Sequence, residues 1–174
     1  MPGHLVIIPT YNERENISDI IDAVQNLGRN FHVLIVDDGS PDGTADLVKE
    51  AMDKYEGRIH LEEREGKLGL GTAYVHGFRY ALDRSFDYVY EMDADFSHNP
   101  EDLLRMSQEL EAKETDVVIG SRYVKGGKLE NWPLDRILLS YGASIYVRLV
   151  TGLPVKDPTA GFIGYKAEVL RSID

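Results

Sequence analysis

Five short runs rich in β-branched residues recur along the chain, and a polar loop and a helical pattern follow each of the first four. The runs lie at residues 4–8, 31–36, 58–61, 87–92 and 116–120. The helical patterns carry apolar residues three and four positions apart and lie at 14–28, 43–56, 69–84 and 100–113. This alternation predicts an α/β fold with a mostly parallel sheet in a three-layer α/β/α sandwich, because right-handed crossovers place helices on both faces.

The pattern changes after residue 120. A glycine-rich loop at 125–127 precedes a long helical pattern at 133–150, and a strand-like run follows at 161–165. The apolar face of the long segment favours a helix that covers the sheet, with a helix on a membrane surface as the alternative.

Length and composition restrict the domain organisation and the chemistry. A chain of 174 residues, 43% of them hydrophobic, can bury a core, and no linker or repeat divides it, so residues 1–174 are predicted to form one domain. The absence of cysteine excludes disulfides, thiolate metal sites and a cysteine nucleophile. The longest apolar stretch, 137–153, is interrupted by polar residues, and the first residues lack the basic segment of a secretory signal. We therefore expect a cytoplasmic protein without a membrane span.

The charge of the chain is unevenly distributed. A net charge of −11 argues against a nucleic-acid partner, because phosphate neutralisation needs a basic surface. Residues 1–116 hold 11 basic and 25 acidic side chains, whereas residues 117–174 hold 8 and 5. The basic last third is predicted to meet an anionic group such as a phosphate or a lipid headgroup, with chance fluctuation as the alternative.

Polar loops follow the first two strands, at the edge where parallel sheets bind ligands. After the first strand, the Tyr11 ring can stack on a base and Glu13 can accept hydrogen bonds from a ring N–H or a ribose, unless the loop is only a turn with helix-capping acids. After the second strand, Asp38 is the predicted acceptor for a nucleobase or ribose. Asp37 is interpreted as structural, and residues 42–44 as a turn and helix cap.

The fourth strand ends in an Asp-x-Asp pair, Asp93 and Asp95. Carboxylates at this spacing can converge on one Mg²⁺ or Mn²⁺ ion, which prefers oxygen ligands and would bridge to a diphosphate. The pair alone is a weak signal, but its position beside a possible nucleotide loop favours a metal site. His98 is interpreted as a loop residue rather than a ligand.

Three further features carry weaker signals, and no Walker loop, nucleophile elbow or HExxH motif accompanies them. Arg122 can pair with a phosphate or with the Asp-x-Asp pair. Asp157 precedes the strand-like run and either orients an acceptor or cation or makes a turn. The glycine-rich residues 66–71 are interpreted as the start of a helix whose free N–H groups approach an anion.

Six sequence blocks, in this order, resemble the family 2 inverting glycosyltransferases of the GT-A fold, and most closely the dolichyl- and polyprenyl-phosphate mannose synthases. The blocks are PTYNERENI at 9–17, VDDGSPDGT at 36–44, KLGLGTAYVHGF at 67–78, MDADFSHNPEDL at 92–103, GSRY at 120–123 and DPTAGFIGYK at 157–166. Together they run through nearly the whole chain, and consecutive blocks with matching spacing are far more specific than any single motif.

The resemblance implies roles for individual residues and a GT-A domain of the Rossmann-like kind. It implies that the nucleotide contacts Pro9, Tyr11, Glu13, Val36 and Asp38. It implies that the diphosphate and an Mg²⁺ or Mn²⁺ ion lie at Asp93, Ala94 and Asp95, with Arg122 near the donor phosphates. Full-length relatives continue with a further helix, strand and basic loop that have no match here, so residues 1–174 are expected to be a catalytic domain truncated at its C-terminus.

The implied reaction is transfer of a hexose, namely mannose from GDP-mannose, to a polyprenyl or dolichyl phosphate with inversion. Asp95, Arg122 and Asp157 are the expected catalytic residues, and basic residues after 117 are expected to hold the acceptor phosphate at a peripheral membrane contact. Three alternatives remain: a family 2 enzyme with a UDP-sugar or a polysaccharide acceptor, a nucleotidyltransferase or Mg²⁺ phosphohydrolase, and a non-catalytic nucleotide-sugar-binding fragment.

Overall fold

The protein is described by a computed structural model that covers residues 3–112, 114–121, 147, 150–152, 155, 157 and 160–173. Its strands are β1 (His4–Thr10), β2 (Phe31–Asp37), β3 (Ile59–Glu63), β4 (Tyr88–Glu91), β5 (Val117–Ile119) and β6 (Ile163–Lys166). Its helices are α1 (Ile17–Gln25), α2 (Thr44–Lys54), α3 (Leu70–Asp83), α4 (Asp102–Glu111) and α6 (Ala167–Arg171).

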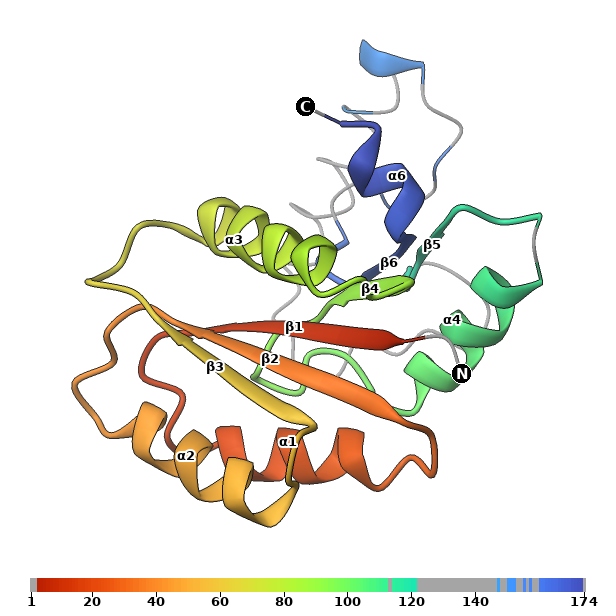
Figure 1. The fold of residues 1–174 in the computed structure, drawn as a ribbon. Helices are drawn as coiled ribbons and strands as arrows, with labels where there is room; N and C mark the ends of the chain where they lie inside the picture. The colour runs from red at the N-terminus through yellow and green to blue at the C-terminus, as the bar shows by residue number, and fades with distance from the viewer. Residues whose placement is uncertain are drawn as a thin grey trace.

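The described strands form one sheet in the order β3-β2-β1-β4-β6-β5 (Figure 1). Strand β1 lies between β2 and β4 and is parallel to both, and β3 is parallel to β2. Strand β6 is antiparallel to both of its neighbours, β4 and β5. The predicted mostly parallel sheet is therefore confirmed, with one reversed strand inserted between the fourth and fifth.

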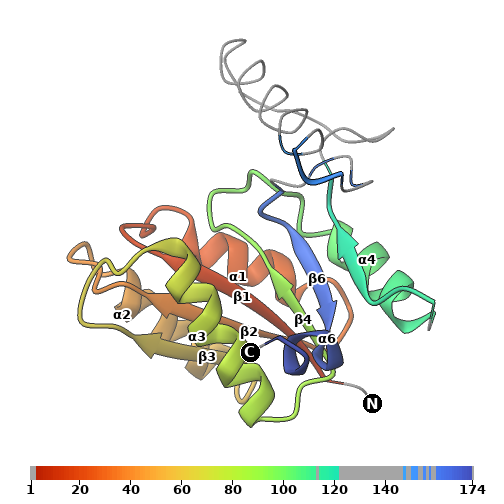
Figure 2. The ribbon, with the colours of Figure 1, turned by 90° about the horizontal axis from the view of Figure 1, so that it is seen from above.

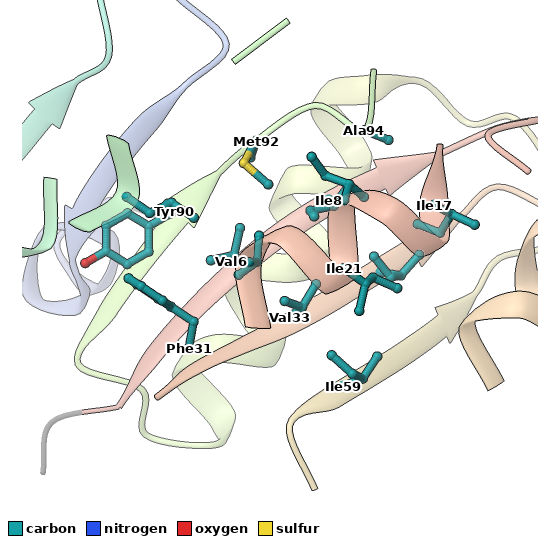
Figure 3. Packing of buried hydrophobic residues seen from close by; sticks show 14 of the residues in the cluster. Val6, Ile8, Ile17, Ile21, Phe31, Val33, Ile59, Tyr90, Met92 and Ala94 are labelled. Atoms are coloured by element: carbon teal, nitrogen blue, oxygen red, sulfur yellow. The ribbon is translucent and has the colours of Figure 1, made fainter. Parts of the chain in front are cut away.

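Helices cover both faces of the sheet, as the alternation predicts (Figures 1 and 2). Side chains of a strand point alternately to its two faces. Val6 and Ile8 of β1 pack with α1, α2 and α4 on one face, and Figure 3 shows them beside Val33 and Ile21. Leu5 and Ile7 of β1 pack with α3 and α6 on the other face. Because all residues of β1 except Pro9 are buried, the strand holds the polar loop that follows it in a fixed place.

The four helices predicted before residue 113 are present but shorter than the sequence pattern. The pattern at 14–28 becomes a helix of nine residues, which ends before Gly28, a glycine with a left-handed φ of 71°. Most of the helical pattern at 133–150 lies outside the described residues. Within the described part of the chain, no helix combines the length and apolar character needed to cross a bilayer.

Candidate functional site

The loops after β1, β2 and β4 meet at one edge of the sheet, because these three adjacent strands are parallel. Strands β1 and β2 end in register, with Pro9 opposite Val36 and Thr10 opposite Asp37. Val36 is fully buried in the core. The sequence prediction that the three polar loops share an edge is therefore confirmed.

Asp37, the first acid of the β2 loop, is a buried structural residue. Its Oδ1 accepts a hydrogen bond from the Thr10 hydroxyl at 2.8 Å and another from the Ser40 hydroxyl at 2.6 Å. Its Oδ2 accepts a bond from the Ser40 N–H at 2.8 Å. These bonds tie the end of β1 to the β2 loop, as expected for a buried carboxylate whose oxygens are occupied within the chain.

Asp38 is also nearly buried, and its main partner is Arg64. The Arg64 Nε lies 2.6 Å and its Nη2 2.5 Å from Asp38 Oδ1, while the Leu68 N–H donates to Oδ2 at 3.2 Å. The two side chains are only 9% and 7% exposed. Each carboxylate oxygen can accept about two hydrogen bonds, so Oδ2 retains capacity for one further N–H or O–H donor.

Arg64 belongs to a segment, residues 64–69, that leads from β3 into α3 and contacts the loops after β1 and β2. Its Nη1 donates to the Thr72 hydroxyl at 2.8 Å, and its backbone N–H donates to the Asp37 carbonyl at 2.8 Å. Lys67 Nζ lies 4.5 Å from the centre of the Tyr11 ring. The predicted helix start is confirmed, and the anion that its Leu68 N–H meets is the chain's own Asp38.

The β1 loop is held in shape by its neighbours. Asn12 has a left-handed φ of 60°, and its N–H donates to the Ser40 hydroxyl at 2.9 Å. The Glu13 N–H donates to the Thr44 hydroxyl at 3.1 Å, and the Glu13 carboxylate accepts a bond from Asn16 at 3.0 Å. The Tyr11 ring is exposed at this loop, so its outer surface is accessible to a ligand.

The start of α2 confirms the predicted turn and cap at 42–44. Gly43 adopts φ 88°, and the Asp42 carboxylate accepts bonds from the Thr44 N–H at 3.0 Å and the Thr44 hydroxyl at 2.6 Å. The hydrogen bond from the Thr44 hydroxyl is the largest cause that lowers the pKa of Asp42. This acid therefore supports the fold of the loop rather than facing the site.

Asp93 follows β4 and is held by α3. The Tyr74 hydroxyl donates to Asp93 Oδ1 at 3.3 Å, while His98 Nε2 lies 3.8 Å from Oδ2. The His98 ring is buried and stacks on Phe162 with centroids 5.0 Å apart. The interpretation of His98 as a loop residue is compatible with this packing. Asp93 itself remains 38% exposed, so part of its carboxylate is open to a ligand.

Asp95 is more exposed than Asp93, and Ser97 is its main partner. The Ser97 N–H donates to Asp95 Oδ1 at 2.9 Å, and the Ser97 hydroxyl donates to the same oxygen. Burial raises the pKa of Asp95, but the hydrogen bonds from Ser97 outweigh it and leave the pKa below its usual range. The intervening Ala94 is buried in the core, and this fixes the backbone between the two acids.

The donor set at this edge suits a hard divalent cation. Asp93 and Asp95 offer oxygen ligands only, which Mg²⁺ and Mn²⁺ prefer. Among the described residues, no group of three or more His, Asp or Glu side chains could hold a metal ion by itself. Two carboxylates fit a cation that takes its remaining ligands from a diphosphate and water, as Mg²⁺ commonly does.

The structure describes only some of the remaining predicted site residues. Asp157 is buried, and its carbonyl oxygen accepts a bond from the Ala160 N–H at 3.3 Å. Its alternative roles, orienting an acceptor or cation or making a turn, stay predictions. Arg122 lies outside the described residues, as do Lys125, Lys128 and Arg136, which belong to the basic residues after 117 that are expected to hold the acceptor phosphate. Arg64 and Tyr74 were not singled out from the sequence, although Arg64 directly follows a strand at the ligand edge.

Solved structures with the same architecture define the class of fold. The chain superposes with a TM-score of 0.69 and 20% identity on the mannosyltransferase PcManGT of Pyrobaculum calidifontis, solved with GDP-Man and Mn²⁺, covering 99% of this chain and 46% of that one. Glucosyl-3-phosphoglycerate synthase of Mycobacterium tuberculosis, solved with Mn²⁺, UDP-Glc and phosphoglyceric acid, gives a TM-score of 0.70 at 21% identity over 98% and 59% of the two chains. The fold is thus the GT-A fold of glycosyltransferases.

Sequence comparison identifies the family. Residues 5–174 match the family described as Glycosyl transferase family 2, and the chain belongs to that family. It is 48% identical over 170 residues to the polyprenol monophosphomannose synthase of Mycolicibacterium smegmatis, covering 98% of this chain and 64% of that protein. It is 46% identical over 171 residues to the undecaprenyl-phosphate mannosyltransferase of Micrococcus luteus, covering 98% and 69%.

A third relative is archaeal. The dolichol-phosphate mannosyltransferase of Pyrococcus furiosus is 40% identical over 175 residues, covering 97% of this chain and 47% of that protein. The chain therefore spans between about half and two thirds of the length of the curated relatives it matches.

Proposed function

We propose that the chain carries the donor-binding site of an inverting mannosyltransferase that moves mannose from GDP-mannose to a polyprenyl or dolichyl phosphate. One observation carries the proposal: an acceptor carboxylate, Asp38, and a pair of accessible carboxylates, Asp93 and Asp95, lie at the same edge of a GT-A sheet. The identity of 40–48% to enzymes named for mannose transfer to polyprenyl or dolichyl phosphates supports this choice of reaction.

The nucleoside is proposed to lie between Tyr11 and Asp38. The exposed Tyr11 ring offers a stacking surface, with the Lys67 ammonium on the ring at 4.5 Å. Asp38 Oδ2 keeps capacity for one more donor after Arg64 and Leu68 have bound. The N1–H of guanine supplies one such donor, and the N3–H of uracil supplies another, so the choice between GDP and UDP needs a direct test.

The diphosphate is proposed to lie at Asp93 and Asp95, with Arg122 beside it. A Mg²⁺ or Mn²⁺ ion bound there would supply positive charge to the leaving nucleoside diphosphate. Asp95 is ready for such a role, because the hydrogen bonds from Ser97 keep its pKa low and the carboxylate ionised at neutral pH.

The acceptor is proposed to be a lipid phosphate held by the basic residues after 117, with Asp157 orienting it. A phosphate is already anionic at neutral pH, so its oxygen attacks the anomeric carbon without a strong general base. The new bond forms on the face opposite the leaving diphosphate, which gives inversion. The same basic residues would make a peripheral membrane contact on the cytoplasmic side.

Thermal unfolding with nucleotides tests the donor. We expect GDP with Mn²⁺ to stabilise the chain more than either alone; saturation at 100 times the Kd adds about 2.7 kcal/mol. Asp95→Asn should remove the Mn²⁺-dependent part of this shift and keep the effect of GDP alone. Asp53→Asn, an exposed acid at the end of α2, is the matched control and should respond as the parent chain does.

Two outcomes would contradict the proposal. A larger shift with UDP than with GDP would assign the chain to another donor, and no shift with any nucleotide would refute a donor site at this edge.

Transfer of labelled mannose from GDP-mannose to undecaprenyl phosphate, with the anomeric configuration read by NMR, tests the reaction and its inversion. Release of pyrophosphate or inorganic phosphate instead would indicate a nucleotidyltransferase or phosphohydrolase.

A further inference from the structure

Helix α3 places one tyrosine against the acid pair. Tyr74 lies in the second turn of α3 and packs with Leu5 and Ile7 of β1 on the face that α3 covers. Only 7% of the residue is exposed. Its hydroxyl donates to Oδ1 of Asp93, which follows the end of β4, at 3.3 Å. The ring is thus fixed by the core while its polar end touches the predicted cation ligand.

The other side of the Asp93 carboxylate is also bounded. His98 Nε2 lies 3.8 Å from Oδ2, and the His98 ring is held in place by its stacking on Phe162. Gly161 lies against the same oxygen, because a Cβ added there would lie 3.3 Å from Oδ2. Asp93 is therefore confined between α3 and the segment that leads into β6, and only its outer part remains accessible.

In its contact with Asp93, the Tyr74 hydroxyl is the donor, because a carboxylate oxygen accepts. Glu91 has its own partner, because the Tyr165 hydroxyl donates to Glu91 Oε1 at 3.2 Å. Each of the two acids at this end of β4, Glu91 and Asp93, therefore has a tyrosine hydroxyl as donor.

We propose that Tyr74 is a positioning residue that holds the Asp93 carboxylate in the orientation required by the divalent cation. The inference rests on the proposed function, since it assumes that Asp93 and Asp95 bind a metal with the donor diphosphate. Without the hydroxyl, Asp93 Oδ1 would lose the hydrogen bond that fixes its orientation, and holding the carboxylate in place for the cation would cost affinity. Partners of this kind, which hold a ligand without touching the metal, typically contribute 10–100-fold to metal affinity or activity.

The test compares Tyr74→Phe with Tyr80→Phe. Both change a buried tyrosine on α3, at 7% and 8% exposure, but the Tyr80 ring contacts His60 and Arg84 instead of the site. Electron paramagnetic resonance titration with Mn²⁺ in the presence of GDP gives the metal Kd without turnover. We expect Tyr74→Phe to weaken Mn²⁺ binding about tenfold, and Tyr80→Phe to leave it unchanged, with both variants folded by circular dichroism.

A double-mutant cycle separates positioning from a general structural effect. In an Asp93→Asn background, Tyr74→Phe should have little further effect on the Mn²⁺ Kd, because the carboxylate that it positions is absent. An equal loss in both backgrounds, or an unchanged Mn²⁺ Kd in Tyr74→Phe, would overturn the inference. If the parent chain binds no Mn²⁺ with GDP, the proposed donor site itself fails, and the two failures are thereby distinguished.

Discussion

At the scale of single residues, two neighbouring aspartates have different environments. Asp37 has its oxygens bonded within the β1 and β2 ends, whereas Asp38 is paired with Arg64 and keeps one acceptor position. Replacing one residue of a buried ion pair is strongly destabilising, because the remaining charge is left without a partner. The Asp38 carboxylate therefore depends on Arg64 for its stability as well as its orientation.

Arg64→Met tests this dependence. We expect the variant to lose about 3–5 kcal/mol of unfolding free energy and roughly 10 °C in melting temperature, because Asp38 stays buried and charged. Adding Asp38→Asn should recover part of the loss. Lys49→Met removes one partner of an exposed ion pair with Glu63 and should leave the melting temperature unchanged. Equal melting of Arg64→Met and Lys49→Met would contradict the prediction.

The sequence predicts the candidate site residues that immediately follow strands, and it misses candidates whose contacts depend on how distant segments pack. Asp38, Asp93 and Asp95 could be proposed because each lies directly after a buried run, where parallel sheets bind ligands. Tyr74 lies inside an amphipathic helix, and its spacing is the same as that of a core residue. Its contact with Asp93 depends on how α3 lies on β1, which no local pattern records.

At the scale of elements, α3 and β1 approach each other closely at Gly77. A Cβ added at Gly77 would lie 2.6 Å from Ile7 Cγ2 and 2.8 Å from Ile7 Cδ1, and Ile7 is fully buried in β1. The close approach fixes the distance between α3 and the sheet at this point. It therefore sets where Tyr74, three residues earlier on α3, meets the end of β4.

Gly77→Ala should destabilise the fold although alanine is the better helix former. Overpacking costs about 1–3 kcal/mol, whereas the gain in helix propensity is at most about 1 kcal/mol. Gly71→Ala is the matched control on the same helix, because nothing lies within 4 Å of the added Cβ. Urea unfolding should show a loss for Gly77→Ala and no loss for Gly71→Ala; the reverse order would contradict the packing.

The elements themselves are largely predictable, but the order of the sheet is not. The apolar run locates β2 at 31–36 against the observed Phe31–Asp37, since a short, nearly continuous apolar run is the local pattern of a strand buried on both faces. The insertion of β6 between β4 and β5 depends on pairing between residues far apart, such as Val118 with Gly164. No local spacing encodes such a pair.

At the scale of the whole molecule, the two ends of the sheet carry different titrating groups. The ends of β1, β2 and β4 lead into carboxylates, whereas His4, His32 and His60 lie at the starts of β1, β2 and β3. Burial lowers the pKa of all three histidines, that of His60 to about 4. His32 Nδ1 and His60 Nε2 are 3.1 Å apart, and this pairing also disfavours a second positive charge.

These histidines predict acid instability that starts far from the site. His60 has an unfolded pKa of 6.5 and a folded pKa of about 4, so its contribution is complete above pH 6.5 and is lost as the pH falls toward 4. After allowance for solvent at the half-buried ring, the loss is on the order of 1–2 kcal/mol. The melting temperature should fall by about 3–6 °C between pH 7.5 and 5 from this source.

The variant His60→Gln isolates the contribution of His60. Glu91, whose pKa burial raises to about 7, acts in the opposite direction as the pH falls, and it is present in both proteins. The part of the difference between the two melting temperatures that changes with pH is therefore due to His60. It should disappear above pH 6.5, where only the constant effect of the lost ring contacts with His32 and Tyr80 remains. Identical acid sensitivity of both proteins would contradict the assignment.

Thr72 and Tyr74 are two residues apart on α3 and contact Arg64 and Asp93, which lie at the two ends of the proposed donor site. Under that proposal, α3 fixes the spacing between the contact on the nucleoside side and the contact on the diphosphate side. Under the proposed function, substitutions within residues 64–69 should therefore change the preference for the nucleobase while the Tyr74–Asp93 contact keeps its place.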